Sequence, residues 1–190
     1  MRYLGNKTRM INNIEEFIDS LNINGKTFCD LFSGSASVAD YFKDRYNIIA
    51  NDLLSSSYVF TYAKVKNNDV PLFTKFNKRF KISPFEYFTK KEYEYSDDHF
   101  IWKNYSPKGN RQFFTEEIAN KIDGVRLELE ELYNSGIFSE NKYNYLLASL
   151  LETMMGVSNT TGTYEAFFKE WDKRSFKKIE LCPLKMKKMW

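Results

Sequence analysis

An apolar run that ends at an acidic residue and continues into a Gly/Ser loop is the stretch of this sequence best suited to chemistry. Residues 28–32 read Phe-Cys-Asp-Leu-Phe, and residues 33–37 read Ser-Gly-Ser-Ala-Ser. Small residues let the backbone of such a loop approach a ligand closely, and a helix that starts there offers free N–H groups. We interpret residues 33–37 as the loop of a nucleoside-type binding site; an ordinary turn of an α/β domain is the alternative.

A second acidic residue, Asp52, follows about 20 residues later, at the end of the apolar run Ile48, Ile49, Ala50. An acidic residue at this spacing is typical of a group that accepts hydrogen bonds from a ribose diol. The loop lacks the Gly-Lys-Ser/Thr of a phosphate-binding P-loop and the Gly-x-Gly-x-x-Gly of a dinucleotide site. The pattern therefore favours a nucleoside over a dinucleotide.

These residues need a strand, a loop, a helix and a second strand to position them. Between the two apolar runs, Val38, Tyr41 and Phe42 have helical spacing, so the stretch predicts the βαβ half of a nucleotide-binding sheet. Ahead of it, apolar residues at helical spacing predict a helix that packs on this sheet: Ile11, Ile14, Ile18 and Leu21. The predicted fold class is α/β, with a partial Rossmann-like sheet and a largely helical insert.

Composition excludes several classes of protein. The chain has 190 residues, enough for one domain with a core or for one domain plus an insert. Its net charge of +3 is too small to indicate, by itself, a protein that binds nucleic acid. Two cysteines far apart, Cys29 and Cys182, and one histidine form neither a metal set nor a disulfide framework, so we expect no metal. Cys29 is expected to be a small core residue. No apolar run approaches a membrane span and no signal peptide opens the chain, which predicts a cytoplasmic protein without a membrane partner.

Basic and aromatic residues alternate over residues 71–81, a pattern suited to a nucleic-acid surface. The interpretation we favour is an amphipathic helix with lysines in water and either Leu72, Phe76 and Phe80, or Phe73 and Phe80, turned inward. Residues 84–111 have no clear periodicity and are expected to form an irregular insert.

Helix-capping residues mark three further helices. Ser55 or Ser56 is expected to cap a helix that carries Tyr58, Tyr62 and Val65. Thr115 is expected to cap a helix that ends at Asn134-Ser135-Gly136, and Ser139 one whose apolar side runs from Tyr143 to Met154. The polar loop 157–164 that follows is either an ordered turn or a binding surface.

Three short motifs together resemble the Dam-like α group of adenine-N6 DNA methyltransferases, over most of the chain. Residues 2–7, Arg-Tyr-Leu-Gly-Asn-Lys, resemble the opening motif X, and residues 30–36, Asp-Leu-Phe-Ser-Gly-Ser-Ala, resemble motif I. Asp52 matches the acidic residue of motif II. Residues 111–115 and 157–164 resemble stretches that lie between the cofactor motifs and the catalytic motif in some relatives.

The resemblance implies S-adenosylmethionine as cofactor, double-stranded DNA as partner and a place in restriction-modification. Lys7 and Tyr3 would bind the methionine end, and Asp52 the ribose hydroxyls. The residues implied in cofactor binding are Tyr3, Gly5, Lys7, Asp30, Leu31, Phe32, Ser33, Gly34 and Asp52. The candidate nucleic-acid contacts are Lys75, Lys78, Arg79, Arg111, Asn159, Thr161 and Tyr164.

The sequence departs from the family pattern in two places. Ala36 stands where the family commonly has glycine, which is expected to trim cofactor affinity only slightly. The four prolines, at 71, 84, 107 and 183, are never adjacent, so the catalytic Asp-Pro-Pro-Tyr is absent from these 190 residues. We therefore expect no catalytic residue here, no efficient methylation by the chain alone, and a second polypeptide that carries the motif.

Other interpretations stay open. The chain could be a fragment of a longer enzyme, with the same chemistry. It could instead be a catalytically inactive methyltransferase-like module that binds DNA or a protein partner, or an α/β enzyme that uses another nucleotide. The expected organisation is a cofactor-binding part at 1–68, a helical or irregular insert at 69–138 with possible DNA contacts, and residues 139–190 packing back on the methyltransferase domain.

Overall fold

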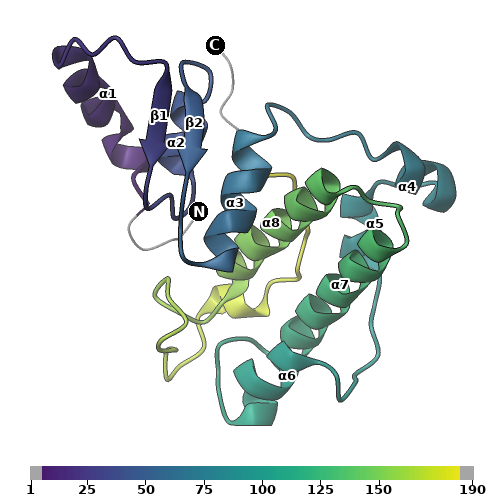
Figure 1. The fold of residues 1–190 in the computed structure, drawn as a ribbon. Coiled ribbons are helices and arrows are strands. Elements are labelled where there is room, and N and C mark those ends of the chain that lie inside the picture. The colour runs from purple at the N-terminus through teal and green to yellow at the C-terminus, as the bar shows by residue number, and fades with distance from the viewer. Residues whose placement is uncertain (1–5, 185–190) are drawn as a thin grey trace. The chain divides into compact units, whose positions relative to one another are not determined.

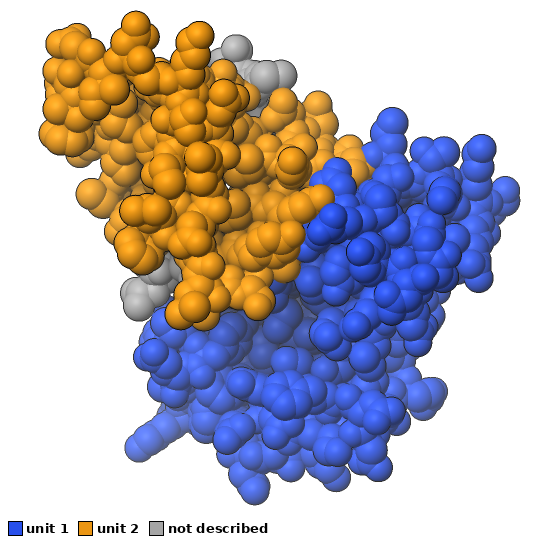
Figure 2. All heavy atoms as spheres, in the orientation of Figure 1, with its two compact units in different colours: residues 1–4, 72–184 blue, residues 5–71, 185–190 orange. Residues whose placement is uncertain are grey.

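The computed structural model describes residues 6–184 and divides the chain into two compact units. One unit is built from residues 5–71 and the other from residues 72–184, shown in orange and blue in Figure 2. The structure is mixed α/β and mostly helical, with a small parallel sheet of two strands in its described part (Figure 1).

The sheet of the 5–71 unit is built from the two predicted apolar runs. Strand β1, Thr27–Asp30, and strand β2, Asn47–Ala50, are parallel, with Thr27 opposite Asn47 and Asp30 opposite Ala50. Helix α2, Ser37–Phe42, connects them. A 3-10 turn, Thr8–Met10, leads into helix α1, Ile11–Ser20, and helix α3, Ser55–Val65, follows β2. The predicted order of strand, loop, helix and strand is confirmed. The predicted Rossmann-like sheet is not confirmed, since the sheet has two strands in the described residues.

One face of this sheet is covered and the other is open. Phe28 of β1 stacks on Phe42 of α2 with ring centroids 4.9 Å apart. Side chains alternate between the faces of a strand, so Cys29 and its register partner Ile49 point the other way; Ile49 is 56% exposed. The prediction that Cys29 is a core residue is wrong, since its thiol is exposed on this open face.

Helix α1 makes polar contacts with α2 and the residues that follow it. Tyr41 donates a hydrogen bond to Glu15 (2.5 Å), and Arg45 pairs with Asp19. Of the predicted apolar stripe, Ile11 is buried, whereas Leu21 lies just beyond the helix and is 48% exposed. The helix itself is confirmed.

The 72–184 unit is helical. Its helices are α4 (Thr74–Phe80), α5 (Pro84–Lys90), α6 (Phe100–Tyr105), α7 (Glu116–Asn134) and α8 (Glu140–Val157), with 3-10 turns at Pro107–Gly109 and Lys173–Phe176. The expectation of an irregular segment at 84–111 is wrong, because α5 and α6 lie within it. Ser83 caps α5 by accepting a hydrogen bond from the Glu86 N–H (3.2 Å), and Pro84 occupies the first helical position.

Helices α7 and α8 pack together and carry much of this unit's core. As predicted, Thr115 caps α7, with its hydroxyl accepting from the Ile118 N–H (3.3 Å), and Ser139 occupies the N-cap position of α8. Helix α4 is amphipathic, as we favoured: Phe73 and Phe76 are buried and Phe80 is half-buried. The alternative with Leu72 turned inward is wrong, since Leu72 is 82% exposed.

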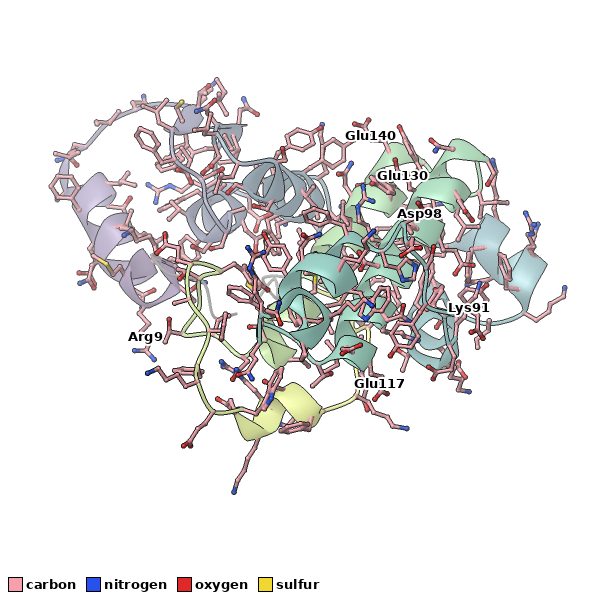
Figure 3. The ribbon with its side chains drawn as sticks, turned by 90° about the horizontal axis from the view of Figure 1, so that it is seen from below. Arg9, Lys91, Asp98, Glu117, Glu130 and Glu140 are labelled. Carbon is pink, nitrogen blue, oxygen red and sulfur yellow. The ribbon has the colours of Figure 1, made fainter. Side chains whose placement is uncertain are left out.

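A carboxylate on α7, Glu128, ties the segment after α5 to this helix. Its two oxygens accept hydrogen bonds from the hydroxyls of Tyr87 and Tyr93 and from the ammonium of Lys91, each at 2.7 Å (Lys91 is labelled in Figure 3). Burial, then the bond to Glu128, raises the pKa of Tyr93. The Tyr93 ring lies against Gly124, where an added Cβ would be 2.2 Å from the ring.

No helix in residues 6–184 is long and apolar enough to cross a membrane. The three-part functional organisation expected from the sequence stays a prediction.

Candidate functional site

The parallel arrangement brings the loops that follow β1 and β2 to the same end of the sheet, where they are joined by hydrogen bonds. The Asn51 N–H donates to the Asp30 carbonyl (2.8 Å), and the Ser33 N–H donates to the Asn51 carbonyl (3.0 Å). The Asn51 side-chain amide also donates to the Leu31 carbonyl (3.0 Å). Ligands of open parallel sheets bind at the carboxyl ends of the strands, so this is the expected place for the predicted nucleoside site.

The predicted ribose acceptor, Asp52, contacts the predicted glycine loop directly. Its Oδ2 accepts the Gly34 N–H at 2.8 Å, and its Oδ1 accepts the Leu54 N–H at 3.0 Å. These backbone donors, Leu54 first, hold the pKa of Asp52 below its ordinary value. An ionised carboxylate has about four acceptor positions, so Asp52 can hold the loop and also accept hydrogen bonds from a ligand.

The loop backbone reverses direction through left-handed conformations at Gly34 (φ 50°) and Ala36 (φ 59°). Glycine adopts this region without steric cost, whereas a Cβ costs about 1–2 kcal/mol there. The departure from glycine at position 36 therefore falls at a backbone conformation that favours glycine, and Ala36 is fully buried.

Two side chains from α3 support the loop from its inner side. The ammonium of Lys64, a buried residue, donates to the Ser35 carbonyl at 2.9 Å. The hydroxyls of Thr61 and Ser33 are 3.0 Å apart and share a hydrogen bond. The loop is thus fixed from β2 by Asp52 and from α3 by these two side chains.

The second carboxylate of the site, Asp30, is half-buried at the end of β1. Burial raises its pKa, and the negative charge of Asp52 adds to this, whereas the N–H groups of Phe32 and Ala39 lower it. The pKa values of Asp30 and Asp52 are therefore shifted in opposite directions. Such shifts are frequent at functional sites.

Apolar side chains project from the two loops. Phe32, two residues before Gly34, is 87% exposed. Leu53, directly after Asp52, is 96% exposed. Exposed apolar groups of this kind suit the face of a purine base. Sequence reasoning missed Leu53; an apolar residue directly after the acid at the end of β2 was the available signal.

The remaining residues predicted to bind the cofactor lie at the start of the chain and in the loop after β1. Lys7 is exposed and precedes the 3-10 turn Thr8–Met10. Tyr3 and Gly5 lie outside the described residues. Leu31 and Ser33 belong to the loop, the former 59% exposed and the latter buried.

The candidate nucleic-acid residues lie in the 72–184 unit. Lys75, Lys78 and Arg79, here called the α4 cations, are exposed on α4, where Lys75 donates to the Gly136 carbonyl (3.2 Å). The Arg79 guanidinium lies over the Phe80 ring, 5.3 Å from its centroid.

The other four candidates come together on two adjacent loops. The Asn159 N–H donates to the Phe113 carbonyl (2.8 Å), and the ring of Tyr164 lies 6.1 Å from that of Phe113. Arg111 is exposed and lies over the Tyr105 ring, 6.0 Å from its centroid. Thr161 is exposed on the second loop, next to the bridge between Thr160 and Phe167.

Asn159 has a different environment from its neighbours. It is fully buried; its amide nitrogen donates to the carbonyls of Gln112 (2.9 Å) and Phe168 (3.0 Å), and its oxygen accepts the Asp172 N–H (3.0 Å). The polar loop is thus an ordered turn held from within by this side chain. Any effect of Asn159 on nucleic acid is through the exposed loop that it positions.

The structure has a cavity of about 420 Å³ elsewhere in the 72–184 unit, lined by both acidic and basic residues. It contains none of the predicted site residues. No cluster of His, Cys, Asp or Glu suited to a metal ion is present in residues 6–184.

Comparison with known proteins identifies relatives over nearly the whole sequence. Residues 3–189 match the family described as D12 class N6 adenine-specific DNA methyltransferase. The chain is 49% identical over 98% of its length to the modification methylase LlaI of Lactococcus lactis subsp. lactis, and 39% identical over 97% to the type II methyltransferase M.FokI of Planomicrobium okeanokoites. It is 32% identical over 96% of its length to the type II methyltransferase M.NlaIII of Neisseria lactamica.

The relatives are considerably longer than the matched region. The chain spans 30% of the LlaI methylase, 29% of M.FokI and 54% of M.NlaIII. No solved structure was found to match the chain.

Proposed function

The chain belongs to the D12 class N6 adenine-specific DNA methyltransferase family, and we propose that its 5–71 unit supplies the S-adenosylmethionine site of such an enzyme. The observation that carries the proposal is the hydrogen bond from the Gly34 N–H to Asp52 at the carboxyl ends of two parallel strands. This contact between Asp52, the proposed ribose acceptor, and the loop proposed to approach the ligand supports the proposal.

The residues at this site fit S-adenosylmethionine. Asp52 would accept hydrogen bonds from the ribose hydroxyls, the exposed Leu53 and Phe32 would contact the adenine ring, and the backbone of residues 30–34 would line the cofactor. Lys7, with Tyr3 and Gly5, would bind the methionine end. When bound, the cofactor supplies a methyl group to the N6 nitrogen of an adenine in DNA.

We propose that the catalytic Asp-Pro-Pro-Tyr, which is not found in these 190 residues, comes from a second polypeptide or a further segment. In this class of enzyme, an acidic side chain and a backbone carbonyl would align the amino group of a flipped adenine with the methyl group. The chain alone would then bind cofactor without efficient methyl transfer, and it would act in the cytoplasm.

Double-stranded DNA is the proposed partner of the 72–184 unit. The α4 cations would contact phosphates, and Arg111, Thr161 and Tyr164 would contact DNA from the loops that meet at Phe113. A methyltransferase-like module that binds DNA or a protein without catalysis is the second candidate, and the missing catalytic motif is the observation that favours it.

Thermal unfolding with and without S-adenosylmethionine tests the cofactor site. A ligand at 100 times its Kd adds about 2.7 kcal/mol of stability, so the unfolding temperature should rise. Adenosine phosphates serve as the comparison, and better protection by them would point to a different nucleotide enzyme. No shift with S-adenosylmethionine would contradict the proposal.

Methyl transfer tests the division of labour. Labelled S-adenosylmethionine and adenine-containing DNA are incubated with the chain alone, and then with a polypeptide that contains the catalytic motif. Transfer only in the mixture supports the proposal, whereas full activity of the chain alone would refute it.

A further inference from the structure

The cavity of the 72–184 unit is not used by the proposed function. Three segments far apart in the sequence line it: the end of α5 with the residues after it, the first turns of α7, and the end of the 3-10 turn Lys173–Phe176 with the residues after it. Its volume of about 420 Å³ lies within the range of small-molecule sites, about 300–1,000 Å³. The cavity is therefore large enough for a small organic ligand.

One wall of the cavity contains a buried charge, the ammonium group of Lys121 on α7. Lys121 is 9% exposed, and its ammonium donates to the carbonyls of Thr89 (3.3 Å) and Lys91. Burial lowers the pKa of Lys121, whereas the negative charges of Glu92 and Glu128 act to raise it. Within residues 6–184 this ammonium forms no ion pair, since Glu128 pairs with Lys91 instead (2.7 Å). Buried charges in proteins are usually paired, so the position favours an anionic ligand group.

The exposed side chains around the cavity provide further kinds of contact. Lys177 and Lys178 are exposed cations that directly follow Phe176, whose side chain is 66% exposed. Glu92 and Glu117 are exposed carboxylates (Glu117 is labelled in Figure 3). Lysine ammonium groups bind phosphate, an aromatic ring stacks on a nucleobase, and a carboxylate accepts hydrogen bonds from an amino group. These three contacts match the phosphate, the base and the exocyclic amino group of a nucleotide.

We propose that this cavity binds a nucleoside monophosphate whose base carries an exocyclic amino group. Lys121 and Lys177 contact the phosphate, and the ring of Phe176 stacks on the base. The carboxylates at the edge of the cavity accept hydrogen bonds from the amino group. A free mononucleotide and the phosphorylated end of a nucleic-acid strand both have this chemistry.

The competing account is a cavity that holds only water, in which Glu92 balances the charge of Lys121. The charges that line the cavity argue against it. Three lysines and two glutamates line the cavity, which leaves one positive charge without a matching negative charge. An anionic ligand would supply that charge.

Titration calorimetry on the full chain tests the site, with cytidine monophosphate as the probe. This nucleotide has an amino group but lacks the adenine that the proposed S-adenosylmethionine site would recognise. Because the phosphate makes charge-assisted hydrogen bonds, cytidine monophosphate should bind about 100-fold more tightly than cytidine. It should also bind more tightly than uridine monophosphate, which has no amino group, and than inorganic phosphate.

Substitution of the exposed ring provides the decisive variant, because it changes no buried contact. Phe176→Ser should weaken binding of cytidine monophosphate by at least about tenfold, since stacking on the base is lost. Phe100→Ser is the control, at an aromatic position that is 61% exposed in the same unit and does not line the cavity. Lys177→Gln should also weaken binding, whereas Lys78→Gln, at an exposed lysine away from the cavity lining, should not.

Lys121→Met tests the buried charge. It should abolish binding, and its unfolding temperature is measured alongside because Lys121 also holds two backbone carbonyls. Binding of cytidine monophosphate that survives in a folded Lys121→Met variant would overturn the inference. If the variant does not fold, the comparison of Phe176→Ser with Phe100→Ser decides.

The outcomes are distinct from those of the proposed function. Equal affinity for cytidine monophosphate and inorganic phosphate, equal effects of Phe176→Ser and Phe100→Ser, or displacement of the nucleotide by S-adenosylmethionine would each overturn the inference. None of these results changes the shift in unfolding temperature by which S-adenosylmethionine binding is tested. Binding of cytidine monophosphate alone would identify a free nucleotide as the ligand, and equal binding of a phosphorylated dinucleotide would identify the end of a strand.

Discussion

Replacing Asp52 with asparagine should loosen the glycine loop and weaken cofactor binding together. Asp52 accepts two backbone N–H groups, from Gly34 at 2.8 Å and Leu54 at 3.0 Å. An amide of the same shape keeps one acceptor oxygen but turns its NH2 group towards the other donor, so one charge-assisted bond is lost. Hydrogen bonds to charged groups contribute about 1.5–3 kcal/mol each, so we expect the 5–71 unit to lose about 2 kcal/mol of stability.

Amide hydrogen exchange in β1 and β2 measures that loss, and titration calorimetry with S-adenosylmethionine measures the effect on binding. If the loop must be ordered for the cofactor to bind, about 2 kcal/mol corresponds to roughly a 30-fold increase in Kd. Asp69→Asn is the control, because it removes the same charge from an exposed position of the same unit. Unchanged exchange in Asp52→Asn would refute the reasoning.

The pH dependence gives an independent readout of the same bond. The pKa of Asp52 is lower in the folded protein than its ordinary value of 3.8, chiefly because of the Leu54 and Gly34 N–H groups. The stabilisation is therefore fully present above the unfolded pKa, near 4, and is lost as pH falls through the folded pKa. The Gly34 amide resonance should titrate in this acidic window, and it should stop doing so in Asp52→Asn.

Three further substitutions test other parts of the structure. Gly124→Ala should destabilise the 72–184 unit by about 3 kcal/mol in urea unfolding, since its Cβ would lie 2.2 Å from the Tyr93 ring. Gly156 lies on α8, and a Cβ added there would meet no atom within 4 Å, so Gly156→Ala should instead add about 0.5–1 kcal/mol of stability. Equal effects of the two substitutions would contradict the packing argument. Asn159→Ala should cost about 3 kcal/mol and speed proteolysis of residues 158–172, because it leaves buried backbone groups without partners, whereas the exposed Thr161→Ala should change neither. Charge reversal of the α4 cations should reduce the slope of log K for DNA against log salt by about 0.9 per phosphate contact removed; an unchanged slope would show that they are only solvated.

The sequence predicted the chemistry-bearing part of the fold because short-range patterns determine it. Both apolar runs are strands: β1 ends at Asp30 and β2 ends two residues before Asp52, and the small residues after β1 form the tight loop. The Asp52 contact with Gly34 was not predicted, because it depends on how β1 and β2 align, a long-range relation that periodicity does not contain.

The errors have physical causes as well. Cys29 was expected in a core because a free cysteine within a strand usually behaves as a small buried apolar residue, but the described residues cover only the other face of the sheet. Ser55 or Ser56 was expected to cap α3, but the helix begins at Ser55 with Leu54 in the cap position. The side chain of Asp52, two residues before Leu54, accepts the Leu54 N–H. Asp52, which is also predicted to bind ribose, therefore takes part of the capping role.

The short helices α5 and α6 were missed because each shows fewer than two turns of periodicity. The Ser83, Pro84 and Glu86 pattern was a sufficient start signal for α5, with serine as the cap and glutamate three residues later. Helix α6 has a cap that is remote in sequence: Asp123 of α7 accepts the N–H groups of Ile101 (3.0 Å) and Trp102 (2.8 Å). No local pattern could reveal it.

The engaged lysines of the 5–71 unit have a practical consequence for mapping the DNA surface by chemical modification. Lys43 donates to the carbonyls of Lys64 and Asn67, each at 2.6 Å, and Lys64 donates to that of Ser35. Ammonium groups held in this way should acetylate slowly whether or not DNA is present. They provide an internal baseline against which protection of Lys75 and Lys78 by DNA can be read in a single mass spectrum.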